Sequence, residues 1–197
     1  MSIHGCTILA IDGTHSSGKT TLATALTQHY QGIGLNAVYL PDPARESPLI
    51  AAVIADPAKS FDLTIELDLF AATITQQIRA TPGHRLVVTD KTLANVLAYA
   101  RLLLKKPQKH KPTFHALTRM CRAWQPYDLV IRCVDHFPID VADDPYRSRV
   151  TELQEAADYA VGVALDEAGY PVVDLPAGLS TDQRIQWILD HPLAPAL

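Results

Sequence analysis

Residues 13–20 read Gly-Thr-His-Ser-Ser-Gly-Lys-Thr, a complete G-x-x-x-x-G-K-[ST] sequence. The run before it, residues 7–11 (TILAI), is short, apolar and followed by Asp-Gly, which is typical of a strand buried on both faces. Residues 19–30 after it have the apolar spacing of an amphipathic helix. A strand, a glycine-containing turn and a helix in this order aim several backbone N–H groups at one point. The segment therefore predicts a loop that binds phosphate groups.

The loop and the residue after it are the expected contacts to a nucleoside triphosphate: Gly13, Thr14, His15, Ser16, Ser17, Gly18, Lys19, Thr20 and Thr21. Lys19 would place its charge on the outer phosphates, and Thr20 would offer its hydroxyl to Mg²⁺. A nucleoside triphosphate with Mg²⁺ is therefore the expected cofactor, and no residue selects ATP over other triphosphates. His15 occupies a variable position of the pattern, and we interpret it as a solvent-facing loop residue.

The rest of the chain alternates short apolar runs with stretches of helical periodicity. Further strands are expected at residues 37–40, 85–89, 129–134 and 171–175. Helices are expected after a cap at Ser60, at residues 92–104 and 113–124, from Pro145 or Arg149 to Ala168, and at residues 181–189. The helix after Ser60 is predicted from Leu63, Leu67, Phe70, Ala71, Ile74 and Ile78. This alternation predicts an α/β fold with three layers, α-β-α, around a mostly parallel five-stranded sheet. No repeat or linker divides residues 1–197, so one domain is expected.

Acidic residues follow the expected strands: Asp12, Asp42, Asp90, Asp135 and Asp174. Ligands of open α/β sheets bind beyond the carboxyl ends of the strands, so these positions are candidates for a site. Asp90 could reach the Mg²⁺ shell or accept a proton from an attacking hydroxyl. The alternative is that it caps the helix beginning at Thr92. Asp12 is expected to support the turn, and Asp135 and Asp174 are interpreted as structural.

Two further segments carry arginines that could face an anion. In the proline-rich loop of residues 41–48, Arg45 could bind a phosphate or carboxylate bidentately beside Asp42 and Glu46; an exposed ion pair is the alternative. Residues 136–150 form a candidate lid, in which Arg147 or Arg149 could close over a transferred phosphoryl group. Ordinary surface arginines are the alternative there.

Composition limits the function classes. The chain has 197 residues, 48% of them hydrophobic and 19% charged, with a formal net charge of −4. The negative balance argues against a general nucleic-acid binder, and the basic residues 105–111 are interpreted as a solvated connection. The three cysteines have no metal-ligand spacing and are expected to be buried thiols. No signal peptide or bilayer-spanning run is visible, so we expect a cytoplasmic protein without a membrane partner.

Taken together, these residues resemble the P-loop nucleoside and nucleotide kinases. The likeness is to the thymidylate kinase-like proteins and to the small ATPase/kinase domains typified by the ribosylnicotinamide kinase domain. Ile11-Asp12-Gly13 resembles the entry to the phosphate loop of thymidylate kinases. Val88-Thr89-Asp90-Lys91, followed by Leu97-Ala98-Tyr99, is similar to their strand-end Asp-Arg motif, with Lys91 in place of the arginine. Residues 42–46 resemble their substrate loop, and residues 143–147 their lid.

The resemblance implies ATP-dependent phosphoryl transfer to a small molecule, such as a nucleoside, a nucleotide or a related metabolite. Lys19, Asp90, Arg147 and Arg149 would be catalytic, and Asp42, Arg45, Glu46 and Lys91 would bind the substrate. Thr20 and Asp90 would hold Mg²⁺. Two alternatives stay open: a regulatory ATPase or nucleotide switch that acts on a protein, and a kinase of nucleic-acid ends. A homodimer is also compatible with the sequence, and no residue selects the acceptor.

Overall fold

The computed structural model describes residues 3–56, 58–104, 107–137 and 154–195. Its strands are β1 (Thr7–Gly13), β2 (Ala37–Leu40), β3 (Leu86–Asp90), β4 (Leu129–Cys133) and β5 (Val172–Leu175). They form one five-stranded sheet in the order β2-β3-β1-β4-β5, and each neighbouring pair is parallel. The predicted α/β class and five-stranded sheet are confirmed, and this sheet is parallel throughout rather than mostly so.

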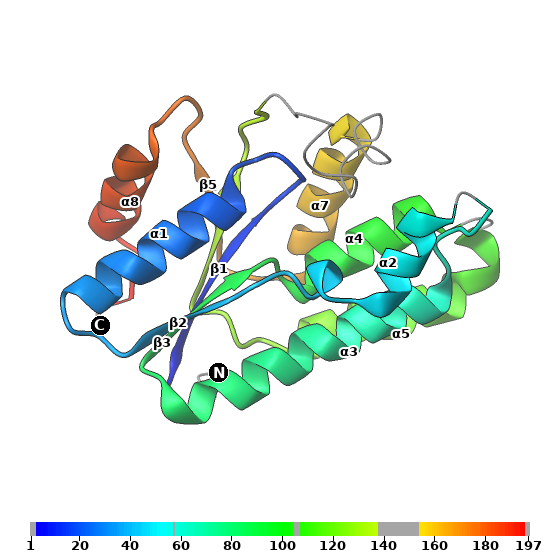
Figure 1. The fold of residues 1–197 in the computed structure, drawn as a ribbon, viewed down its shortest axis with the longest axis horizontal. Coiled ribbons are helices and arrows are strands. Elements are labelled where there is room, and N and C mark those ends of the chain that lie inside the picture. The colour runs from blue at the N-terminus through cyan, green and yellow to red at the C-terminus, as the bar shows by residue number, and fades with distance from the viewer. Residues whose placement is uncertain (1–2, 57, 105–106, 138–153, 196–197) are drawn as a thin grey trace.

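Helices cover both faces of the sheet, as a parallel sheet requires. They are α1 (Lys19–Gly32), α2 (Pro48–Ala55), α3 (Leu63–Ala80), α4 (Leu93–Leu103), α5 (Lys111–Ala123), α7 (Gln154–Ala168) and α8 (Thr181–Asp190). Short 3₁₀ turns lie at Pro43–Arg45, Thr81–Gly83 and Pro107–His110. Helices α1 and α8 lie on one face, and α3, α4, α5 and α7 lie on the other (Figure 1). None of the helices described has the length and apolar character to cross a bilayer.

Alternate residues of the central strand β1 enter two different cores. Ile8 and Ala10 pack into the core formed with α3, α4, α5 and α7. Leu9 and Ile11 pack into the core formed with α1 and α8. This alternation follows from the period of two along a strand. It explains why the sequence of β1 is continuously apolar. The three cysteines are buried and unbridged, as expected.

The structure corrects three local predictions. Helix α2 was not predicted, because its eight residues, PLIAAVIA, are apolar with no helical period to detect. The cap of α3 is Asp62 rather than Ser60: its Oδ1 accepts hydrogen bonds from the backbone N–H groups of Thr64 and Ile65. The buried face of α3 is also rotated from the predicted one, since Leu67 and Ile78 are each 42% exposed. The predicted start of α7 lies outside the described residues.

A buried polar network joins α3, α4 and the segment before β4. The Tyr127 hydroxyl accepts hydrogen bonds from Gln77 Nε2 at 3.0 Å and from the Leu93 backbone N–H at 3.1 Å. The Trp124 indole N–H donates to Gln77 Oε1 at 3.0 Å. Tyr127 and Gln77 are both buried. Buried donors are costly to leave unpaired, so this network fixes how the two helices meet.

Replacing Tyr127 by Phe should destabilise the fold, because it leaves the Gln77 amide and the Leu93 N–H without their shared acceptor. We expect the free energy of unfolding to fall by about 1–3 kcal/mol. Urea denaturation followed by circular dichroism measures this. Tyr159 is 77% exposed, so Tyr159→Phe is the control and should change stability by less than about 0.5 kcal/mol. Equal effects of the two substitutions would contradict the role given to Tyr127.

Candidate functional site

A cavity of about 520 Å³ opens at the carboxyl ends of β1 and β3. Most residues predicted for the site line it: His15, Ser16, Gly18, Lys19, Thr20, Thr21, Asp42, Arg45, Asp90 and Lys91. Beyond them the cavity has two ends. The α8 end consists of Phe137, Leu179, Ser180, Thr181 and Arg184. The α3 end consists of Ile50, Ile54, Phe61, Glu66, Leu69, Val96 and Leu103. The phosphate loop, residues 13–20, therefore meets a cavity of ligand size.

Two glycines shape the phosphate loop. Gly13 has φ +136°, and a Cβ at this position would lie 2.6 Å from the Cys133 carbonyl oxygen. Gly18 has φ +80°, and a Cβ there would lie 2.9 Å from Arg184 Nη1 and from the Phe137 ring. Both conformations are ones that side chains rarely adopt. Only glycine lets the loop pass this close to β4 and to α8.

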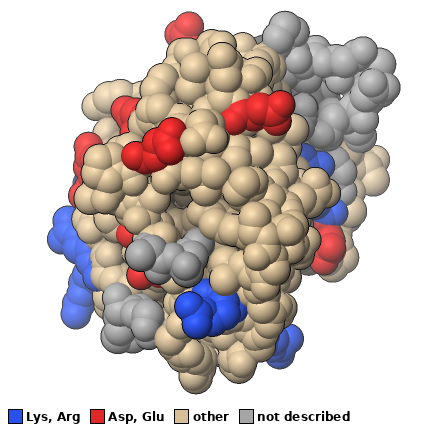
Figure 2. Space-filling model, turned by 90° about the vertical axis from the view of Figure 1, so that its left-hand side faces the viewer, with Lys and Arg blue, Asp and Glu red and all other residues tan. Residues whose placement is uncertain are grey.

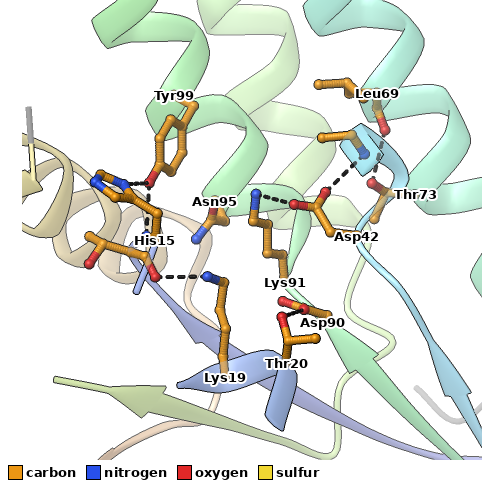
Figure 3. A network of polar contacts seen from close by, with 12 residues as sticks. His15, Lys19, Thr20, Asp42, Leu69, Thr73, Asp90, Lys91, Asn95 and Tyr99 are labelled. Carbon is orange, nitrogen blue, oxygen red and sulfur yellow. Dashed lines mark hydrogen bonds and ion pairs between the residues drawn. The ribbon is translucent and has the colours of Figure 1, made fainter. Parts of the chain in front are cut away.

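Lys19, the first residue of α1, is buried and reaches back over the loop. Its Nζ donates a hydrogen bond to the Thr14 carbonyl oxygen at 2.7 Å (Figure 3). Burial lowers the pKa of Lys19, although the nearby Asp90 carboxylate opposes this change. An amine that is buried at a loop of backbone N–H groups is suited to attract an anion.

Thr20 and Asp90 bring two oxygen ligands together. Thr20 Oγ1 donates a hydrogen bond to Asp90 Oδ2 at 2.5 Å, and the Tyr39 hydroxyl donates to the same oxygen at 3.4 Å. The other oxygen, Oδ1, is buried without a hydrogen-bond partner among the described residues. A hydroxyl beside a carboxylate is a donor set that suits Mg²⁺, and the unpaired oxygen suits a metal-bound water. The described chain holds no cluster of three or more His, Cys, Asp or Glu residues suited to a metal.

Asp12 joins the phosphate loop to α4. Its Oδ1 accepts hydrogen bonds from the Gly13 N–H at 2.6 Å and from Asn95 Nδ2 at 2.5 Å. Its Oδ2 accepts from the Thr92 N–H at 3.0 Å and from the Thr92 hydroxyl at 2.6 Å. Asn95 also donates to the Gly13 carbonyl oxygen. The carboxylate thus holds the end of β1 against the first turn of α4. Thr92, not Asp90, caps this helix.

His15 is held by Tyr99, which corrects its expected solvent-facing position. The ring Nδ1 lies 3.1 Å from the Tyr99 hydroxyl oxygen, and the His15 backbone N–H donates to the same oxygen at 3.3 Å. His15 is half-buried. Tyr99 therefore supports the outer part of the phosphate loop from α4.

Lys91 and Asp42 form a half-buried ion pair that lines the same cavity as Lys19. Their Nζ and Oδ2 atoms are 2.5 Å apart (Figure 3). Burial disfavours both charges, but the pairing holds the pKa of Asp42 below and that of Lys91 above its ordinary value. Lys91 Nζ also lies 5.3 Å from the centre of the Tyr99 ring. Lys91 has φ +84°, a conformation unusual for a lysine, so its backbone is strained where its charge is placed.

The other predicted substrate residues differ in position. Arg45 is exposed and lines the cavity, whereas Glu46 is exposed and is not among its lining residues. Arg147 and Arg149 lie outside the described residues. The two residues that flank residues 138–153, Phe137 and Gln154, both contact the phosphate loop. The Phe137 N–H donates to the Ser16 carbonyl oxygen at 2.8 Å, and Gln154 Nε2 donates to the His15 carbonyl oxygen at 3.1 Å.

Asp135 positions Arg184 at the wall of the cavity. Their carboxylate and guanidinium groups are 2.6 Å apart, and Arg184 is buried. The guanidinium also donates to the Ser17 carbonyl oxygen and lies 5.1 Å from the centre of the Phe137 ring. Asp174 pairs instead with Arg132, outside the cavity. Asp135 thus has an indirect part in the site, through the arginine it holds.

Sequence reasoning gave no site role to five residues of the site: Glu66, Asn95, Tyr99, Phe137 and Arg184. Tyr99 was quoted only as part of the Leu97-Ala98-Tyr99 likeness. Asn95 follows Thr92 by three residues and Tyr99 follows Asn95 by four, which places all three on one face of a helix. That spacing, directly after the strand-end Asp90, is a signal that could have identified them. Arg184 is far from the phosphate loop in the chain, and nothing in its local sequence marks it.

Comparison with known proteins shows the family and the fold of this chain. The family model described as AAA domain matches residues 9–184. No curated protein sequence matches the chain at a significant level. Among solved structures, the NadR protein in complex with NR has a TM-score of 0.71 and 20% identity over 93% of this chain. This chain spans only half the length of that one, since the match covers 50% of the NadR chain.

Two thymidylate kinases match over nearly their whole length. The enzyme from Candida albicans has a TM-score of 0.62 and 18% identity, over 94% of this chain and 90% of its own. The enzyme from Ehrlichia chaffeensis has a TM-score of 0.59 and 16% identity, over 94% and 97%. Identities this low show a shared fold, and they confirm the fold that the resemblance implied. The chain belongs to the AAA domain family and is a P-loop domain with the fold of the nucleotide kinases.

Proposed function

We propose that this chain transfers the γ-phosphoryl group of ATP to a small-molecule acceptor, a nucleoside, a nucleotide or a related metabolite. One observation carries the proposal. The cavity at the phosphate loop also contains Asp90, which contacts Thr20, and a second lysine, Lys91. A hydrolase or a switch needs the loop, but it does not need a second ligand-sized end next to it. The fold shared with NadR and the thymidylate kinases supports the same class.

The triphosphate would lie along the phosphate loop with its base toward the α8 end. The loop N–H groups and Lys19 would bind the β- and γ-phosphates, once Lys19 exchanges the Thr14 carbonyl for a phosphate oxygen. The Phe137 ring lies beside Gly18 with the buried Arg184 packed against it, and a purine could stack on the exposed part of this ring. A solved NadR structure holds NAD and AMP-PNP, a triphosphate analogue, which supports this class of ligand.

Thr20 and Asp90 would hold Mg²⁺, partly through water. When bound, the ion neutralises charge on the phosphate oxygens. Asp90 has a second role in the proposal: its unpaired Oδ1 can orient the acceptor hydroxyl and take its proton. The acceptor oxygen would then form a bond to the γ-phosphorus as the bond to the β–γ bridging oxygen breaks, leaving ADP.

Lys91, Asp42 and Arg45 would contact the acceptor, because all three line the cavity. Lys91 would bind its anionic groups as a point charge, without the bidentate geometry of an arginine. The proposal also keeps Glu46 as a candidate at the rim, and Arg147 or Arg149 as the cation that neutralises the transferred group. The contacts of Phe137 and Gln154 with the phosphate loop support this role, since they hold both flanks of residues 138–153 beside it.

The alternatives have less support. On the face that Figure 2 shows, where α8 and the end of α1 lie, the described residues carry separate acidic and basic side chains. A kinase that binds nucleic-acid ends would be expected to have a continuous basic surface, and the formal net charge of −4 gives no support for one. A regulatory ATPase would hydrolyse ATP at a rate set by a protein partner. Measuring ADP production against a panel of nucleosides, nucleoside monophosphates, sugars, NR and a short oligonucleotide, with and without added cell protein, tests all three. Stoichiometric phosphorylation of one compound supports the proposal; partner-dependent hydrolysis alone would refute it.

Replacing Lys19 by Ala should weaken Mg-ATP binding at least tenfold, because the substitution removes the only buried cation that the described part of the phosphate loop contributes. Isothermal titration calorimetry measures the affinity. The control is Lys59→Ala, since Lys59 is exposed and lies outside the cavity. Unchanged affinity in the Lys19 variant would remove the phosphate loop from the proposal.

Replacing Asp90 by Asn should leave Mg-ATP affinity within a few-fold of its original value but lower the transfer rate by roughly 100-fold or more. The amide keeps the size of the carboxylate and loses the proton acceptor. Calorimetry gives the affinity, and single-turnover kinetics give the rate. Asp190→Asn, at an exposed position at the end of α8, is the matched control. Full transfer activity in the Asp90 variant would exclude it as the base.

A further inference from the structure

The α3 end of the cavity has apolar walls. They are contributed by α2, α3, α4 and the segment before α3: Ile50, Ile54, Phe61, Leu69, Val96 and Leu103. The aliphatic and aromatic side chains of these walls suit a flat ring. A sugar or a phosphate bound there would have its polar groups left without hydrogen-bond partners. One ionisable side chain, Glu66, projects from this apolar lining.

Glu66 lies in the first turn of α3 and is only 2% exposed. Its Oε2 is buried and accepts no hydrogen bond from any residue that the structure describes. Burial raises the pKa of Glu66 to about 7, and Asp62 adds to this effect while Lys91 opposes it. Lys91 is already paired with Asp42. Glu66 therefore has a charged neighbour, but its Oε2 has no hydrogen-bond partner among the residues that the structure describes.

Other buried polar residues of α3 are fully used by the fold. Thr73 donates its hydroxyl to the Leu69 carbonyl oxygen at 2.9 Å (Figure 3). Gln77 donates to Tyr127 and accepts from Trp124. The contrast with Glu66 is informative, because buried polar groups of a folded core nearly always have partners. A carboxylate that lacks one, and that lines a cavity, is placed for a ligand rather than for stability.

We propose that Glu66 is a specificity-determining residue, which accepts a hydrogen bond from an N–H group on the ring of the acceptor. This inference rests on the proposed function, since it assigns the α3 end to the acceptor. The ring would lie between the apolar walls, with its N–H edge against the Glu66 carboxylate. Its phosphorylated group would point back toward Asp90 and Lys91, which line the same cavity. A ring without an N–H would leave the buried carboxylate unpaired and be rejected.

Matched ligand pairs test the inference. Adenosine, cytidine, uridine and inosine, and NR as a carboxamide-bearing probe, are titrated by calorimetry in the presence of a non-hydrolysable ATP analogue and Mg²⁺. Each is compared with its counterpart in which every N–H of the ring edge or amide is replaced by N-methyl. The original protein should bind at least one parent compound about tenfold or more tightly than its methylated form. If no pair differs tenfold, or no probe binds, the inference is overturned.

Variants of Glu66 separate recognition from folding. The Glu66→Gln variant should bind the preferred parent compound at least about tenfold more weakly than the original protein does. The variant's affinity for the ATP analogue should stay unchanged. Glu155→Gln, at an exposed position on α7, is the control. Glu66→Met should lose discrimination between parent and methylated compounds yet keep or raise the thermal midpoint, since it removes an unpaired buried carboxylate.

Two results would overturn the assignment even if a ligand pair is discriminated. One is unchanged affinity in Glu66→Gln, and the other is a lowered thermal midpoint in both Glu66 variants, which would mark a structural residue. The two proposals fail in different ways. If the original protein does not bind the ATP analogue, or does not transfer a phosphoryl group, the proposed function is refuted. Transfer without N–H discrimination would refute only the role of Glu66.

Discussion

The structure depends on one buried carboxylate, that of Asp12. A charge in the core is tolerated only when its oxygens are satisfied, and here both accept two hydrogen bonds each. The donors come from two parts of the chain, the entry to the phosphate loop and the first turn of α4. Because α4 follows directly from β3, the same contacts fix where β3 ends. The positions of Asp90, Lys91 and Tyr99 follow from this single attachment.

The fold then distributes chemistry along one cavity. Its middle is set by backbone geometry, with glycines that allow the phosphate loop to approach β4 and α8. Its α8 end is set by the Asp135–Arg184 pair, which places a buried guanidinium beside an aromatic ring. Its α3 end is set by apolar packing around the Glu66 carboxylate, whose Oε2 has no hydrogen-bond partner in the described part of the chain. Backbone geometry, an ion pair and apolar packing thus create three chemically different parts of one cavity.

How much of this could be predicted depends on whether the signal is local. The phosphate loop was predictable because one short pattern contains its glycines, its lysine and its hydroxyl. The strands were predictable because burial on both faces makes them continuously apolar. Helix α2 was missed because its sequence, PLIAAVIA, is also continuously apolar and has no polar face from which a helical period could be recognised. Arg184 reaches the loop only through the tertiary fold, which no local pattern contains.

Glu66 shows a different limit. The helical period of α3 was read correctly from its apolar residues, but the chosen face included Leu67 and Ile78, which are exposed. The true buried face contains Glu66, Phe70, Thr73 and Gln77. Three of these are polar, so hydrophobicity alone selects the wrong side of the helix. Only packing against α4 and the segment before β4 identifies it.

The left-handed backbone of Lys91 sets local stability and ligand chemistry against each other. A lysine in this conformation costs about 1–2 kcal/mol relative to a residue without a side chain. A thermostabilisation programme that replaces strained residues by glycine would therefore select this position early. Glycine would relieve the backbone strain, but the half-buried Asp42 carboxylate would lose its ion-pair partner, and this loss opposes any gain in stability. At this turn, an unstrained backbone and a positively charged cavity wall are competing properties.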